Sequence, residues 1–231
     1  MRGLLYNQLL TFRLPLGAIF GSQIFAMLVA LLGGNDYSVQ FGMNVCLIVP
    51  YIIFLLTNSE LFHYDEREKW CCFAVSTPLS FKGQVAAKYL FSLGINVLTL
   101  LTALICCGIM SAFTGENLIS MMRTGLVAFG LTVTLNAFEF PFYFRFGSEH
   151  GSQIKAASIG VVLLAVCIYG LFGDISFLFS DTIVQDFINI MNGTFFRTFS
   201  AVIPAISVGL LFLSFWISTP LYRKGMECYE K

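Results

Sequence analysis

Charge is scarce in this chain of 231 residues, of which only 11% are charged and 57% are hydrophobic. An ordinary soluble domain has about 25% charged and about 45–50% apolar residues. Too few polar side chains are present to cover a surface that faces water, so the composition indicates an integral membrane protein. The 13 basic and 13 acidic residues cancel, and bulk charge therefore gives no reason to expect nucleic-acid binding.

Motifs for catalysis are missing as well. The chain has no G-x-x-x-x-G-K-[ST] phosphate loop, which excludes ATP hydrolysis by the usual means, and no GxGxxG, HExxH or GxSxG motif. The only histidines are His63 and His150, and neither has a second ligand at metal spacing. The seven cysteines form no CxxC pair, and most lie in apolar runs. We therefore expect no catalytic residue, no metal site and no cofactor bound by this chain.

Long apolar runs are what the sequence does contain. A membrane-spanning helix needs about 20 mostly apolar residues, and six windows meet this length. They predict an all-α integral membrane protein with six transmembrane helices, and residues 1–231 form a single transmembrane domain because no stretch remains for a soluble one. The windows are Leu14–Gly34, Val39–Thr57, Tyr89–Phe113, Thr124–Phe144, Ile154–Gly173 and Ala201–Tyr222.

The basic residues indicate how the chain is oriented. Lys and Arg near span ends are retained on the cytoplasmic side. With the N-terminus inside, the inner segments hold eleven of the 13 basic residues, and only Arg123 and Arg197 lie outside. We therefore expect cytoplasmic N- and C-termini. The outer segment 174–200 has apolar residues at helical spacing, with Ser180 and Gly193 as plausible caps, and predicts an extracellular amphipathic helix; a poorly ordered loop is the alternative.

The inner loop between the second and third windows is the most informative segment. Thr57 followed by Glu60 fits a capping box, Pro78 disfavours helix at the preceding residue, and Ser80 can cap the next helix. This pattern predicts helix, turn, helix, with a mixed-charge stretch beside aromatic residues. From the residues alone, a solvated connector and a docking element for a cytosolic partner remain equally open.

Polar residues inside the predicted spans are costly and therefore informative. Asn44, Asn96 and Asn136 can line a path or a subunit interface, although hydrogen bonds between packed helices are the favoured interpretation. Glu139 lies six residues before Arg145. We expect Glu139 to pair with a basic group near the inner interface rather than to relay protons.

Several segments resemble the permeases of ABC-2 type transporters, in particular small six-span permeases of bacteria that include exporters of amphipathic peptides. The inner loop carries the most specific match, followed by a Pro, aromatic, basic-Phe-Gly-x-Glu pattern after the fourth window. The two chain ends are also similar. The matching segments are Tyr64-Asp65-Glu66-Arg67-Glu68-Lys69-Trp70, Phe73–Ser80, Lys88-Tyr89, Glu139-Phe140-Pro141, Phe144–Glu149, Met1–Leu5 and Leu221–Glu227.

The resemblance implies a type V exporter-like permease architecture in the cell membrane. Residues 1–13 would include an interfacial connecting helix, and loop 58–83 would contain a coupling helix that docks on a separate ATP-binding subunit. Tyr64 to Trp70 would form that contact, with Asp65, Glu66 and Glu68 as its polar partners. ATP and Mg would be bound by the partner subunit, and a second permease, identical or related, would complete the complex.

The implied function is ATP-driven outward movement of an amphipathic or hydrophobic substrate such as a peptide, drug or lipid. Two alternatives remain. An ion-coupled carrier acting alone would need several carboxylates in its spans or a repeat, and the chain offers one carboxylate and no convincing repeat. A sensor or scaffold subunit would use the inner loop to dock a signalling partner. The sequence specifies neither the substrate nor the identity of the partners.

Overall fold

The computed structural model describes residues 2–33, 36–67, 80–114, 118–172 and 193–226. In this part of the chain every regular element is an α-helix, which confirms the predicted all-α class. The helices are α1 (Arg2–Thr11), α2 (Arg13–Gly33), α3 (Asp36–Thr57), α4 (Glu60–Arg67), α6 (Ser80–Thr114), α7 (Leu118–Phe172) and α9 (Thr194–Met226). The predicted extracellular helix in segment 174–200 lies almost entirely outside the described residues.

Five helical stretches in the described part of the chain are long and apolar enough to cross a membrane. They are Arg13–Gly33, Phe41–Glu66, Lys82–Phe113, Met121–Ala157 and Phe196–Arg223. The remaining predicted window, Ile154–Gly173, falls mainly in the second half of α7, where few side chains are described. These stretches indicate a multi-pass membrane protein. The sixth span and the orientation of the termini stay predictions.

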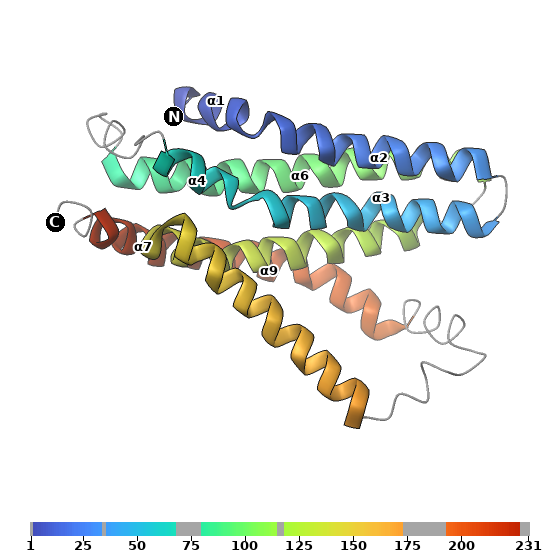
Figure 1. The fold of residues 1–231 in the computed structure, drawn as a ribbon. Helices are drawn as coiled ribbons and strands as arrows, with labels where there is room; N and C mark the ends of the chain where they lie inside the picture. Colours follow the sequence, from blue (N-terminus) through green and yellow to red (C-terminus); the bar gives the residue numbers. More distant parts are fainter. Residues whose placement is uncertain (1, 34–35, 68–79, 115–117, 173–192, 227–231) are drawn as a thin grey trace.

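Helix α7 is two helices joined at Gly147. This residue has φ 83° and ψ 178°, a backbone conformation that is essentially restricted to glycine. The chain reverses there, and the second half of α7 leans away from the other helices (Figure 1). The start of α1, helix α4, the Gly147 bend and the end of α9 all lie at one end of the molecule, which we name the α4 end (Figure 1).

The remaining long helices form a bundle in which α2 packs on α3, α6 contacts α2, α3, α7 and α9, and α7 packs extensively on α9. Helices α2 and α3 approach closely because Gly42 has no side chain. A Cβ atom on Gly42 would lie 2.6 Å from the Cβ of Ala30 and 2.9 Å from the carbonyl oxygen of Ala26. Small residues at such crossings are typical of helix packing in membranes.

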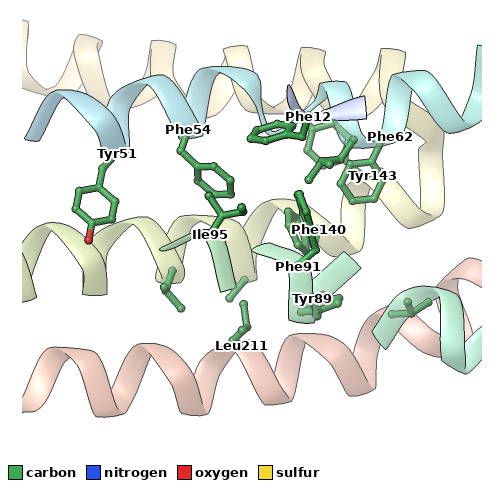
Figure 2. Close-up of a cluster of buried hydrophobic side chains, with 14 of the residues drawn as sticks. Phe12, Tyr51, Phe54, Phe62, Tyr89, Phe91, Ile95, Phe140, Tyr143 and Leu211 are labelled. Atoms are coloured by element: carbon green, nitrogen blue, oxygen red, sulfur yellow. The ribbon is translucent and has the colours of Figure 1, made fainter. Parts of the chain in front are cut away.

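An aromatic core fills the α4 half of the bundle (Figure 2). Phe12 at the α1–α2 junction is fully buried and packs edge-on against Phe54 of α3 and Phe91 of α6, with ring centroids 5.8 and 5.9 Å apart. A second, smaller cluster joins α2, α3 and α6 farther from α4 and includes the buried free cysteines Cys46 and Cys107. Leu61 and Phe62 of α4 belong to this aromatic core, which therefore lies directly against α4.

Candidate functional site

Helix α4, the described part of the inner loop, packs on the bundle through two apolar side chains. Leu61 and Phe62 are buried, and the Phe62 ring stacks on Tyr143 of α7 with centroids 4.7 Å apart. The same ring meets Phe140 and Phe144 edge-on, at 5.3 and 5.1 Å. Aromatic pairs in these geometries stabilise packing beyond simple burial. Helix α4 therefore packs against α7 and is not surrounded by solvent.

An ion pair fastens α4 to α6. Nζ of Lys88 lies 2.7 Å from a carboxylate oxygen of Asp65, donates a hydrogen bond of 2.5 Å to the carbonyl oxygen of Leu61, and lies 4.2 Å from the ring centroid of Phe62. The side chain of Lys88 is only 8% exposed. A buried cation without partners would be strongly destabilising, so Asp65 and Leu61 compensate the charge of Lys88.

A second polar contact fastens α4 to the bend in α7. The backbone N–H of Ser148 donates a hydrogen bond of 2.6 Å to a carboxylate oxygen of Glu66, and the hydroxyl of Ser148 donates to the other oxygen. Nδ1 of His63 also lies 3.2 Å from this hydroxyl. Ser148 begins the second half of α7, where backbone N–H groups lack partners inside the helix and the helix dipole favours an anion. Glu66 therefore caps this helix from α4.

The start of α4 differs from the sequence prediction. Thr57 ends α3, and its hydroxyl donates a hydrogen bond of 2.8 Å to the carbonyl oxygen of Ile53. The predicted capping box with Glu60 is therefore wrong, because the Thr57 hydroxyl bonds back into α3. Residue Ser59 lies at the start of α4 instead, where its carbonyl oxygen accepts hydrogen bonds from the backbone N–H groups of Phe62 and His63.

A buried polar cluster lies below α4 and joins α3, α6 and both halves of α7. Asn58 donates to Oδ1 of Asn136 at 2.8 Å and to a carboxylate oxygen of Glu139 at 3.1 Å. Lys155 donates to Oδ1 of Asn58 at 2.8 Å, and its Nζ lies 3.4 Å from Glu139. It also donates to the carbonyl oxygen of Leu55. Every charge in the cluster has partners, as burial among apolar helices requires.

The basic partner of Glu139 in the described structure is Lys155, from the second half of α7. Arg145 follows Glu139 by six residues in the same half of α7, whereas the reversal at Gly147 returns Lys155 to the level of Glu139. Both side chains of the pair are about one-tenth exposed, and Arg145 is half-buried. The expected structural pair thus forms with a basic residue from beyond the bend.

The three predicted asparagines have different environments. Asn136 is fully buried and donates to the Ser92 hydroxyl of α6 at 3.3 Å, in addition to accepting from Asn58. Asn96 is also buried, but its amide donates to the carbonyl oxygen of Ser92 in its own helix, at 2.9 Å. Asn44 lies on the exposed face of α3. Among the three, only Asn136 makes a described side-chain hydrogen bond between helices.

The predicted contact segment is only partly described. Tyr64, Asp65, Glu66 and Arg67 lie in α4, whereas Glu68, Lys69 and Trp70 lie outside the described residues. Tyr64 is 40% exposed, but both carboxylates are engaged within the chain. Lys88, Ser148, Asn58 and Lys155 complete the site. Lys88 and Ser148 lie in the motifs that carry the resemblance, but the pairings of all four were not predicted, because their partners come from distant helices. The sequence signal for the bend in α7 is Gly147, followed by Ser148, because glycine readily adopts the positive φ found there.

These contacts connect α4 to two long apolar helices, α6 and α7. Force applied to α4 would reach α6 through Lys88 and α7 through Ser148. Within the described residues no three His, Cys, Asp or Glu side chains converge in a way that could hold a metal ion. The arrangement is suited to mechanical transmission.

Comparison with known proteins gives one match. A family model described as "ABC-2 family transporter protein" matches residues 3–223, which is nearly the whole chain. No curated protein and no solved structure matches significantly.

Proposed function

The chain belongs to the ABC-2 transporter family, and we propose that it is the permease subunit of an ATP-driven exporter that moves an amphipathic or hydrophobic substrate outward. Members of this family are typically membrane subunits of transporters, without a catalytic site of their own, and generally work with an ATP-binding subunit. One observation carries the proposal for this chain. Helix α4 is fastened to two membrane helices by Asp65–Lys88 and Glu66–Ser148.

In the proposed mechanism, α4 is the coupling helix. An ATP-binding subunit contacts its exposed side, where Tyr64 lies, and the segment up to Trp70 extends this contact. ATP and Mg are bound and used by that subunit. Closure of two such subunits beneath two permeases displaces α4, and a rigid anchored helix passes the displacement on to α6 and α7.

Photo-crosslinking tests the docking step directly. A photoreactive amino acid placed at Tyr64 should form an adduct with a co-expressed ATP-binding subunit, identified by mass spectrometry. The same residue placed at Ile206, a 55% exposed position in the middle of α9, is the matched control and should form none. An adduct at both positions, or at neither while the complex is intact, would contradict docking at α4.

Transport measurements separate this proposal from the two alternatives. Vesicles that contain the purified complex should accumulate substrate when ATP is added, and a proton uncoupler should not reduce the rate. Loss of transport with the uncoupler would support an ion-coupled carrier. A chain that purifies without any ATP-binding subunit and moves no substrate would support a sensor or scaffold.

A further inference from the structure

A groove between α6 and α9 has no role in the proposed coupling mechanism. It has a volume of about 320 Å³ and is lined by Ala86, Tyr89, Leu90 and Leu93 of α6 and by Leu211, Phe212, Phe215 and Trp216 of α9. This volume is at the low end of the roughly 300–1,000 Å³ typical of small-molecule sites. All of its lining residues lie in two of the stretches that are long and apolar enough to cross a membrane, so in a bilayer the groove lies at the level of the hydrocarbon region.

The walls of the groove are apolar. The single hydroxyl among the lining side chains belongs to Tyr89, and it bonds to the hydroxyls of Ser214 and Ser218 at 2.6 and 2.7 Å. The groove therefore presents the Tyr89 ring and not its polar atom. Trp216 and Phe212 are 77% and 63% exposed at the rim. A flexible hydrocarbon chain fits these side chains, because the one other polar atom among them is the indole nitrogen of Trp216, whose side chain is exposed.

Lys82 of α6 and Arg223 of α9 lie beyond the lining residues of the groove, toward the α4 end. Lys82 precedes Ala86 by four residues, and Arg223 follows Trp216 by seven, so each cation continues the helical face that lines the groove. Both side chains are exposed. The hydroxyl of Tyr222 donates to Oε1 of Gln84 at 2.8 Å, which brings the two helix ends together. Because an α-helix rises about 1.5 Å per residue, the offset of seven residues places Arg223 about 10 Å from Trp216 along the axis of α9.

From this juxtaposition we infer that the groove binds an anionic phospholipid of the surrounding membrane. One acyl chain lies between α6 and α9, and the phosphate lies at the membrane surface beside Lys82 and Arg223. Basic residues at the ends of transmembrane helices attract anionic headgroups in this way. A second copy of the chain fits less well, because a two-fold interface centred on the groove would bring the cations of both copies together.

The two tryptophans of the chain make a direct test possible. In the variant Trp70→Phe, Trp216 is the only tryptophan, and lipids with brominated acyl chains quench its fluorescence on contact. The variant is reconstituted in phosphatidylcholine vesicles with a small fraction of brominated phosphatidylglycerol or brominated phosphatidylcholine. We expect brominated phosphatidylglycerol to quench Trp216 at a fraction of the total lipid roughly tenfold lower than the fraction of brominated phosphatidylcholine that gives the same quenching.

Further variants assign this preference to the groove. Adding Lys82→Gln and Arg223→Gln should make the two lipids equally effective, whereas Arg13→Gln, an exposed cation at the start of α2, should leave the preference unchanged. If the double variant fails to fold, high salt added to the Trp70→Phe protein should remove the preference by screening. Equal quenching of the Trp70→Phe protein by both lipids would overturn the inference. The absence of quenching by either lipid would also overturn it, because it would indicate that a protein neighbour covers Trp216.

Discussion

A carboxylate oxygen of Glu66 lies 2.6 Å from the backbone nitrogen of Ser148, the first residue after the bend at Gly147. Helix α4 is therefore attached at the point where the two halves of α7 diverge. A displacement of α4 acts on this point directly.

Replacement of Glu66 tests the energetic weight of this contact. Glu66→Ala leaves the N–H of Ser148 without its acceptor, and loss of a helix cap of this kind costs about 0.5–2 kcal/mol. We expect a lower unfolding temperature in detergent. Glu149→Ala removes a neighbouring exposed carboxylate and should change stability by less than about 0.5 kcal/mol. Equal effects of the two changes would mean that Glu66 does not act as a cap.

The bend itself is tested by Gly147→Ala. The φ of 83° and ψ of 178° at this position are unfavourable for any residue with a Cβ, at a cost of about 1–3 kcal/mol. We expect reduced expression and a lower unfolding temperature. Gly94→Ala in α6 is the matched control, because a Cβ there meets no atom within 4 Å and helical geometry favours alanine. A stable Gly147→Ala protein would argue against the reversal at this residue.

The buried pair is tested by a double-mutant cycle. Glu139→Gln or Lys155→Met alone leaves the other charge buried without its counterion, and such changes cost about 3–5 kcal/mol in buried pairs. The double variant should recover part of this loss, because no uncompensated charge remains. The same cycle with Glu139→Gln and Arg145→Met should be additive within about 0.5 kcal/mol. Thermal unfolding in detergent gives the stability of all six proteins, which are the unchanged protein, three single variants and two double variants. An interaction energy between Glu139 and Arg145, with none between Glu139 and Lys155, would contradict the structure.

The helices were predictable because each depends on a continuous apolar run that the sequence displays directly. Ser80, for example, was predicted to begin a helix that enters the membrane, and α6 begins at Ser80. The family resemblance also rested on contiguous motifs, and the match over residues 3–223 confirms it. Local patterns were sufficient for both conclusions.

The partners inside the site were not predictable in the same way. Glu139 has Arg145 as its nearest basic neighbour in sequence toward the inner end, and only the reversal at Gly147 brings Lys155 beside it. The acidic residues of the loop appear in a mixed-charge run that favours solvated carboxylates. Their engagement by Lys88 and Ser148 depends on how α4 is seated on α6 and α7.

The contacts of α4 with α6 and α7 change the effects that we expect from substitutions in α4 on the proposed complex. Asp65 was expected to contact the ATP-binding subunit, but its carboxylate pairs with Lys88, whereas Tyr64 is exposed. Asp65→Asn removes the charge that balances Lys88 and loosens α4 on α6. We therefore expect this variant to retain the ATP-binding subunit during purification but to lose most of the stimulation of ATPase activity by substrate.

Tyr64→Ala is the complementary change, because it alters the exposed side of α4 and leaves both anchors intact. We expect it to weaken binding of the ATP-binding subunit, measured by co-purification at increasing dilution, while the unfolding temperature of the permease alone stays unchanged. The two variants should thus separate docking from transmission. If Asp65→Asn released the subunit and Tyr64→Ala did not, the carboxylate would face the partner in the assembled complex, and the Asp65–Lys88 pair would have to open when the subunit binds.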